Sequence, residues 1–202
     1  GGPNAGLSDA FLAKYDASGI VLWTRQTGTA TDGSASGVAV DGAGNAYIAG
    51  STQGGLGGPN AGLSDAFIAK YDVAGTLLWM RQFGTSSLDS ATSVAVDSVG
   101  DAYITGQSTG SLGGPHAGSW DAFLAKYDAA GTLLWMRQIG TEAEELCRSV
   151  AVDGAGNAYI TGRTKGSLDG IHHDGFFGDA FLVKFDSSGT PLWTRQVGTT
   201  AN

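Results

Sequence analysis

A segment of about 20 residues occurs four times in this chain, and this repetition limits the fold more than any other feature. One copy reads DAFLAKYDAAGTLLWMRQIG. The copies start at Asp9, Asp65, Asp121 and Asp179, so they are 56, 56 and 58 residues apart. A fixed period near this length is typical of propellers and other repeat arrays, in which neighbouring repeats bury the apolar faces that one repeat alone leaves exposed.

A second repeated block lies between these copies. It reads GVAVDGAGNAYIAG from Gly37, SVAVDSVGDAYITG from Ser93 and SVAVDGAGNAYITG from Ser149. Together the two blocks supply four short segments per repeat, named A to D in chain order, such as SVAV, NAYIT, DAFLAKY and TLLWMRQ. They are rich in Val, Ile, Tyr, Phe and Trp and are bounded by Gly and Asp, as strands are. We predict an all-β fold, a β-propeller of four-stranded antiparallel blades with about 56 residues per blade.

The number of segments predicts three and a half blades. Residues 9–27 supply only C and D, a half blade, and full blades cover about 37–83, 93–139 and 149–197. Residues 1–202 are therefore expected to be part of a single propeller. Segment C of the half blade lacks a segment B beside it, and an unpaired strand edge invites association. We expect a piece of a longer propeller, of about seven or eight blades.

The motif Asp-x-x-Gly joins A to B and C to D in every repeat. Glycine reaches the left-handed conformation that a short hairpin loop requires, and the aspartate oxygen accepts a hydrogen bond from the backbone two residues on. The motif aspartates are Asp16, Asp41, Asp72, Asp97, Asp128, Asp153 and Asp186. The repetition favours a structural turn over a phosphate or cation loop, since no helix-opening Gly-x-Gly-x-x-Gly, P-loop lysine or EF-hand pattern is present.

Segment D carries one tryptophan in every repeat. These residues are Trp23, Trp79, Trp135 and Trp193, and we expect them to pack between neighbouring blades. Pro191 lies in the last copy of D, and proline cannot donate the N–H that a central strand needs. Segment D is therefore predicted at the outer edge of each blade. The lysines and arginines that recur in C and D are expected to pair with repeat aspartates or edge carbonyls.

The blocks DAFLAKYDASG, LLWMRQ and SVAVDGAGNAYITG resemble the bacterial beta-propeller repeat known as the SBBP repeat, over nearly all of the chain. The resemblance implies a propeller, of the kind found in large secreted or cell-surface proteins of bacteria and archaea. It implies no catalytic mechanism and brings no catalytic residues. An extracellular or cell-surface location is the expectation that follows from it.

Charge and cysteine content exclude several classes of site. The net charge of −8 disfavours nucleic acid as a partner, and no apolar run approaches the roughly 20 residues that span a bilayer. Cys147 is the single cysteine, so an intrachain disulfide and a cysteine-based zinc site are excluded. It aligns with Ala35 and Ala91, which predicts a small buried thiol rather than a nucleophile.

The third full blade departs most from the repeat, in two loops. The D–A loop reads GTEAEELCRS (140–149), and the B–C loop reads RTKGSLDGIHHDGFFGD (163–179), two residues longer than its counterparts. In a four-stranded meander both kinds of loop emerge on one face, and loops on a rigid scaffold often carry binding. The candidate binding residues are Glu142, Glu144, Glu145, Arg148, Asp169, His172, His173, Asp174, Phe176 and Phe177.

The histidines of the longer loop allow two interpretations. His172, His173 and Asp174 are of the types that bind Zn²⁺, but adjacent residues of an extended segment point apart. A solvated loop in which Phe176 or Phe177 caps the core is preferred. No cofactor is expected, and a structural cation such as calcium is neither required nor excluded.

The sequence favours a non-catalytic, extracytoplasmic scaffold or recognition module that binds a protein or glycan through the face of the D–A and B–C loops. The other expected partners are the remaining blades of a longer chain or other copies. Two alternatives stay open. One is a structural assembly unit of a surface layer or appendage. The other is a glycan-active lyase or hydrolase, which needs paired carboxylates, and Glu142, Glu144 and Glu145 are its only candidates.

Overall fold

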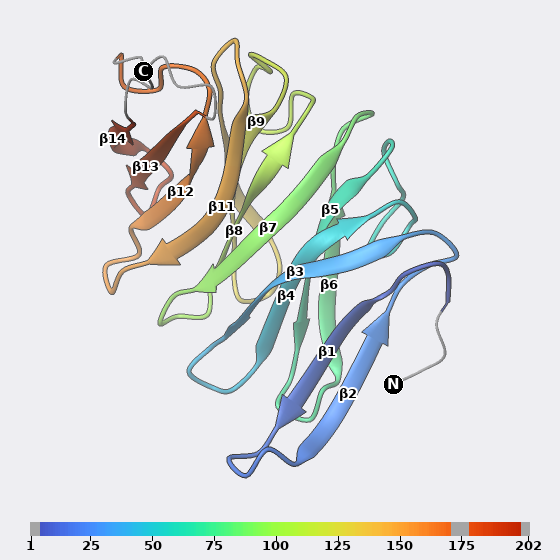
Figure 1. Ribbon diagram of the computed structural model, residues 1–202. Helices are drawn as coiled ribbons and strands as arrows, with labels where there is room; N and C mark the ends of the chain where they lie inside the picture. The colour runs from blue at the N-terminus through green and yellow to red at the C-terminus, as the bar shows by residue number, and fades with distance from the viewer. Residues whose placement is uncertain (1–4, 171–177, 199–202) are drawn as a thin grey trace.

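The computed structural model describes residues 5–170 and 178–198, and this part of the chain consists of β-strands joined by turns and loops (Figure 1). Three sheets have four strands each, in the orders β3-β4-β5-β6, β7-β8-β9-β10 and β11-β12-β13-β14, and β1-β2 forms a two-stranded sheet. All neighbouring strands within the sheets are antiparallel. The predicted all-β propeller of four-stranded blades, with a half blade first, is confirmed.

The strands have the following bounds: β1 Ala10–Tyr15, β2 Val21–Thr27, β3 Gly33–Val40, β4 Ala46–Thr52, β5 Asp65–Tyr71, β6 Leu77–Phe83, β7 Asp89–Val96, β8 Ala102–Ser108, β9 Asp121–Tyr127, β10 Leu133–Ile139, β11 Glu145–Val152, β12 Ala158–Thr164, β13 Asp179–Phe185 and β14 Pro191–Val197. The sheets follow one another as a fan, from β1-β2 at the lower right of Figure 1 to β11–β14 at the upper left.

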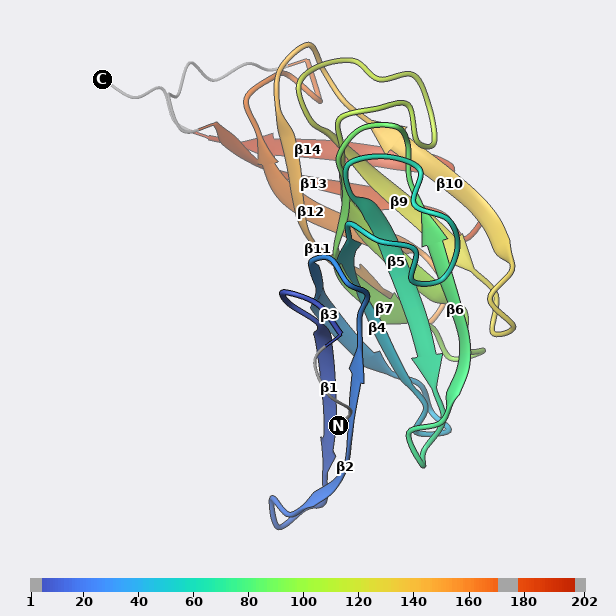
Figure 2. The ribbon, with the colours of Figure 1, turned by 90° about the vertical axis from the view of Figure 1, so that its right-hand side faces the viewer.

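The order of strands within each blade follows the chain. Strands β6, β10 and β14 form one edge of their sheets, and β14 contains Pro191, so the prediction that segment D is an edge strand is confirmed. The opposite edges are β3, β7 and β11, which pack against one another from blade to blade. Figure 2 shows the D strands β6 and β10 along the same outer margin of the fan.

The A strands begin four residues earlier than the repeated blocks suggest, at Gly33, Asp89 and Glu145. The ladder to the B strand shifts register once in each, for example between Cys147 and Ser149. Such a bulge inserts one unpaired residue, Arg148 in the last blade, and bends the strand. The bulge interrupts the alternation of apolar and polar residues, which is why the first half of strand A looks like a loop in the sequence.

The core lies between the sheets rather than within one blade. An aromatic residue of each following C strand packs against the preceding sheet, and Phe67, Phe123 and Phe181 are all buried in this way. Each blade also sends Tyr47 or Tyr103 toward the next, where the hydroxyl donates to the carbonyl of an A–B turn at 2.9 Å. Blades therefore stabilise one another, as the repeat pattern requires.

All seven Asp-x-x-Gly segments are tight turns with the glycine in the left-handed region, at φ between 78° and 89°. In the turn after β11, Asp153 Oδ1 accepts hydrogen bonds from the backbone N–H groups of Ala155 (3.0 Å) and Asn157 (2.9 Å). Asp153 Oδ1 is thus directed at the turn's own N–H groups, which is the geometry of the structural turn that the repetition favours.

The tryptophans of strand D link each blade to the next. The indole Nε1 of Trp79 donates to the carbonyl of Ala129 at 3.1 Å, and the neighbouring Arg81 Nε donates to the carbonyl of Gly131 at 2.8 Å. Trp23 and Trp135 make the corresponding bonds to the turns of their next sheets. These indoles are half-buried, so each combines apolar contact with a hydrogen bond across the blade boundary.

In the three full blades, the lysine of strand C lies against the A–B turn of its own sheet. Lys126 Nζ is 3.6 Å from Asp97 Oδ2 and 3.0 Å from Asp101 Oδ2, and it stands 4.8 Å from the centre of the Tyr103 ring. Lys70 and Lys184 repeat the ion pair and the ring contact. The lysines thus pair with repeat aspartates as the sequence indicates.

Acid titration of the turn aspartates provides a test of their structural role. Hydrogen bonds from the Asn157 side chain and backbone lower the pKa of Asp153 from 3.8 to about 2. A carboxyl group whose pKa is lowered in the folded state stabilises it above pH 3.8, and this contribution is lost as the pH falls toward 2. The melting temperature is expected to fall between about pH 4 and pH 2, with a shallower fall in Asp153→Asn. A pH-independent melting temperature over this range contradicts the role.

Candidate functional site

The long D–A and B–C loops lie at the upper end of the sheets in Figure 1, opposite the Asp-x-x-Gly turns. The D–A loop that leads into β11 contacts the B–C loops of two blades. Its end is fixed on one side by the N–H of Glu145, which donates to the carbonyl of Trp120 at 2.7 Å. On the other side the N–H of Lys165 donates to the carbonyl of Glu144 at 2.9 Å. The D–A and B–C loops of the third blade, which differ most from the repeat, are therefore in contact.

An ion cluster joins the D–A loop to the end of β12 and to the B–C loop that follows it. Glu144 Oε1 lies 2.6 Å from Arg163 Nη2 and 3.3 Å from Lys165 Nζ, and all three side chains are partly exposed. The second blade has a leucine, a glutamine and a threonine at the corresponding positions. The cluster is therefore particular to the third blade, and its charged groups remain within reach of solvent.

Trp120 is a further candidate, which the sequence reasoning missed. It lies in the B–C loop before β9, is half-buried, and forms a β-bridge with Glu144. The first two copies of the repeat have Ser8 and Ser64 at this position. The signal in the sequence that could have identified Trp120 is the tryptophan count, because the chain has five and the repeat pattern accounts for four. Partly exposed aromatic rings beside charged groups are common in recognition surfaces.

Glu145 differs from its prediction as a binding residue. It begins β11 and is fully buried, because Thr141 and Thr164 surround its carboxylate. Thr141 donates from its N–H (2.6 Å) and hydroxyl (2.7 Å), and the hydroxyl of Thr164 donates at 2.6 Å. Buried carboxylates are stable only when they are paired or hydrogen-bonded in this way. Glu145 therefore holds the loop to the sheet and is not available to a partner.

The other predicted residues within the described part have different surroundings. Glu142 is exposed in the D–A loop. Arg148 is exposed but lies at the bulge of β11 rather than in the loop, because the strand starts earlier than expected. Asp169 Oδ2 accepts a hydrogen bond from the backbone N–H of Gln196 at 2.9 Å, so it joins the B–C loop to β14.

The remaining candidates, His172, His173, Asp174, Phe176 and Phe177, lie outside the described residues. Within residues 5–170 and 178–198, no three His, Cys, Asp or Glu side chains gather in a group that could hold a metal ion. The same residues include no helix long and apolar enough to cross a membrane.

Cys147 is a buried free thiol, as predicted. Its Sγ accepts a hydrogen bond from Thr105 Oγ1 at 2.8 Å, and burial raises its pKa to about 11. Since the thiolate is the reactive form, native protein is expected to react negligibly with a thiol reagent such as dithiobis(nitrobenzoate) at pH 8. One thiol per chain should react after denaturation in guanidinium chloride. Fast stoichiometric labelling of the native state is the contrary result.

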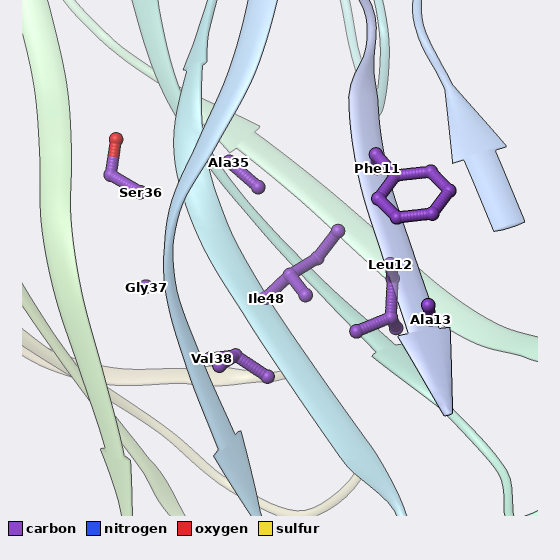
Figure 3. A pocket seen from close by; sticks show the side chains of 8 residues that line it. All are labelled: Phe11, Leu12, Ala13, Ala35, Ser36, Gly37, Val38 and Ile48. Atoms are coloured by element: carbon purple, nitrogen blue, oxygen red, sulfur yellow. The ribbon is translucent and has the colours of Figure 1, made fainter. Parts of the chain in front are cut away.

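An apolar hollow lies away from this loop face, between β1 and the inner strands of the first full blade (Figure 3). It is lined by Phe11, Leu12, Ala13, Ala35, Ser36, Gly37, Val38 and Ile48. Ser36 is the one lining residue with a polar side chain. It lies beside the free edge of β1, where the other sheets continue with their A and B strands.

Two curated proteins are similar to the chain over most of its length. Regulatory protein FlaEY of Caulobacter vibrioides is 31% identical over 172 residues, which are 77% of this chain and 18% of that protein. The WD repeat-containing protein L264 of Acanthamoeba polyphaga mimivirus is 26% identical over 170 residues, 70% of this chain and 12% of that protein. The chain thus spans less than a fifth of each relative.

Solved structures of similar shape include a Bacteroides caccae protein of unknown function and a eukaryotic initiation factor. The first is 12% identical, with 90% of this chain and 73% of that chain covered and a TM-score of 0.43. The second is 10% identical, with 94% and 43% covered and a TM-score of 0.46.

The repeats themselves match a family model described as Beta-propeller repeat. The matched residues are 22–58, 78–113 and 134–169, which together make up more than half of the chain. Each match runs from strand D of one sheet through strands A and B of the next, so it includes the blade boundary that the tryptophans hold. The chain therefore belongs to the SBBP beta-propeller repeat family.

Proposed function

We propose that the chain is a non-catalytic propeller scaffold of an extracytoplasmic protein, and that it recognises a protein or glycan through its long-loop face. The observation that carries the proposal is the gathering of non-repeat residues on that face. Trp120, Glu144 and Lys165 come from three loops of two neighbouring blades, and Arg163 comes from the end of β12. The rest of the chain keeps close to the repeat.

The chemistry of this face suits an amphipathic partner. The ring of Trp120 offers apolar area, and the ion cluster offers a carboxylate acceptor and cationic donors beside it. Both protein surfaces and sugar rings combine apolar and hydroxyl or amide groups in this way. The loops are held by backbone hydrogen bonds to each other, so little conformational entropy is lost when a partner binds.

The acids of the loop favour binding over hydrolysis. A glycan-active enzyme needs two carboxylates that reach the same bond. Glu145 is buried against its threonines and Glu144 is engaged with two cations, which leaves Glu142 as the one of these three without such engagement. The name of the relative FlaEY, a regulatory protein, is also consistent with a role that depends on recognition.

The proposal is tested with a pull-down from a source extract and a glycan array, each run with the native chain and with Trp120→Ser. This variant introduces the residue that the first two repeats carry, so it should fold normally. We expect it to lose at least about tenfold in affinity for whatever partner is captured, as central aromatic residues of interfaces do.

The matched control is Val99→Ala, which restores the repeat residue on the opposite, A–B turn face. It should bind like the native chain. Equal binding by native chain and Trp120→Ser, or equal losses in both variants, would overturn the assignment of this face.

A further inference from the structure

The second full blade holds a buried acid at the start of strand A with uncharged donors. Asp89 has 0% of its surface exposed. Thr85 donates to Asp89 Oδ2 from its N–H at 2.5 Å and from its hydroxyl at 2.9 Å. The hydroxyl of Ser108, which ends strand B, donates to Asp89 Oδ1. One N–H and two hydroxyl groups therefore satisfy a carboxylate at this place.

The third full blade repeats this arrangement with a longer acid. Glu145 accepts hydrogen bonds from the N–H and hydroxyl of Thr141 and from the hydroxyl of Thr164. These two threonines correspond in the repeat to Thr85 and Ser108. Aspartate and glutamate differ in length by one methylene group, yet the same three donors reach both. The donors therefore recognise the carboxylate group rather than one particular side chain.

The first full blade keeps the donors and has a glycine in place of the acid. Thr29 stands at the threonine position of the D–A loop, and Thr52 ends strand B. Gly33 begins strand A, where the other two blades have Asp89 and Glu145. The φ of Gly33 is not positive, so the backbone conformation does not require a glycine. We name the N–H and hydroxyl of Thr29 and the hydroxyl of Thr52 the carboxylate cradle.

The threonine of the cradle has the same place as its counterpart beside an acid. A Cβ added at Gly54 would meet Thr29 Oγ1 before any other atom, and a Cβ added at Gly110 would meet Thr85 Oγ1 first. The position of Thr29 thus does not depend on an acid at the start of strand A. The cradle is preorganised, which lowers the entropic cost of binding a carboxylate.

The groups of the cradle make only local bonds in the first full blade. Thr29 Oγ1 lies 2.9 Å from Thr31 Oγ1, and Thr52 Oγ1 donates to the carbonyl of Gly54 at 3.2 Å. Within residues 5–170 and 178–198, the N–H of Thr29 has no acceptor. Hydrogen bonds to a charged acceptor are stronger than those between neutral groups, so a carboxylate would compete well for these donors.

A small polar hollow of about 80 Å³ borders Gly33. A Cβ added at Gly33 would lie 3.7 Å from Thr52 Oγ1 and from the carbonyl oxygen of Ser51, and 3.9 Å from that of Ser8, which are ordinary contacts. Ser8 and Ser51 also line the hollow. Pockets for drug-sized molecules start at roughly 300 Å³, so this hollow suits a group of only a few atoms.

We propose that the carboxylate cradle binds the carboxylate group of a ligand, in the place that the side chains of Asp89 and Glu145 take in the other blades. The ligand class is an aliphatic carboxylate, because –CH₂–COO⁻ is the group that Gly33 does not supply. Asp32 lines the hollow, and Glu144 has the same position beside the carboxylate of Glu145, so an acid there is compatible with the site. The cradle is separate from the residues that carry the proposed function and does not depend on it.

Sodium acetate is the probe, because acetate is the side chain of aspartate cut at the Cα–Cβ bond. Thermal melting of the full chain at pH 7 compares acetate with chloride at equal ionic strength. We expect acetate to raise the melting temperature saturably, with a Kd on the order of 1–100 mM for so small a ligand. At about ten times the Kd, the rise should be about 2–5 °C. The amide resonance of Thr29 should shift along the same binding curve.

Two variants exchange the states of the blades. Gly33→Asp supplies the carboxylate from the chain itself, so it should melt higher than the native chain in chloride and lose the rise with acetate. Asp89→Gly gives the second blade the composition of the first, so it should melt lower in chloride and recover with acetate. The matched control is Gly42→Asp, which adds the same charge where nothing lies within 4 Å of an added Cβ. It should keep the native response.

N-acetylaspartate methylamide distinguishes the two sources of such a group. A larger rise with this compound than with acetate identifies an acidic side chain of a partner, and a smaller rise identifies a free acid. Equal melting in acetate and chloride, or a native-like acetate response in Gly33→Asp, overturns the proposal. If Gly33→Asp does not melt cooperatively, Thr29→Val takes its place. It should weaken acetate binding at least about threefold, and unchanged binding also overturns the proposal.

Discussion

Replacing Phe123 by alanine is expected to lower the free energy of unfolding by about 3–5 kcal/mol. Phe123 is fully buried and belongs to the cluster between the first and second full blades, together with Tyr47 and Ile68. Its ring also meets the edge of Phe83, with centroids 5.8 Å apart. Removal of the large side chain leaves a cavity, and the neighbouring strands are too rigid to fill it completely. Urea denaturation followed by circular dichroism measures the loss.

The repeat supplies its own control for this prediction. Phe11 occupies the same position of strand C in the half blade, with its ring exposed. Phe11→Ala is expected to change the free energy of unfolding by less than about 1 kcal/mol at low protein concentration, as exposed positions do. Similar losses in both variants would mean that stability does not arise between the blades.

The architecture was predictable because the sequence repeats its signals. Four apolar segments, two glycine turns and one tryptophan recur in each period. A segment that is ambiguous in one copy can therefore be assigned from the other copies. The position of strand D followed from a single residue, Pro191, because one missing N–H is incompatible with a central strand. Strand boundaries were less certain, since the first half of strand A contains polar residues.

The candidate site was only partly predictable, for physical reasons. Glu145 looked like an exposed loop acid, because nothing local shows that the hydroxyls of Thr141 and Thr164 will surround it. Trp120 escaped notice because it lies outside the repeat pattern of segment D. The pairing of Glu144 with Arg163 joins the D–A loop to the end of β12, 19 residues further along the chain, and only the folded blade brings the two together.

The interblade role of the tryptophans was predicted, but the site that receives them was not. Three of the indoles lie against the glycine of a turn about 50 residues further along the chain, as Trp79 does against Gly131. In the sequence, the turn conformation alone is a sufficient reason for a glycine at this position. A second requirement on the same residue, space for a neighbour's ring, is visible only in three dimensions.

Gly131→Ala is therefore expected to lower the free energy of unfolding by about 2–5 kcal/mol. This loss is larger than the replacement of a left-handed glycine ordinarily causes. The φ of 81° is unfavourable for alanine, and an added Cβ would lie 2.7 Å from Cδ2 of Trp79. The indole must move, which weakens its hydrogen bond to the carbonyl of Ala129. Urea denaturation measures the loss, and a shift of tryptophan emission to longer wavelength should accompany it in the native state.

Gly19→Ala separates the two requirements. Gly19 has nearly the same φ, 80°, but nothing lies within 4 Å of an added Cβ, so the conformational cost of about 1–2 kcal/mol acts alone. The difference between the two variants measures the contribution of the indole contact. If both lose the same free energy, the glycines serve their turns only, and the tryptophans hold the blades without any steric requirement on the turns that they contact.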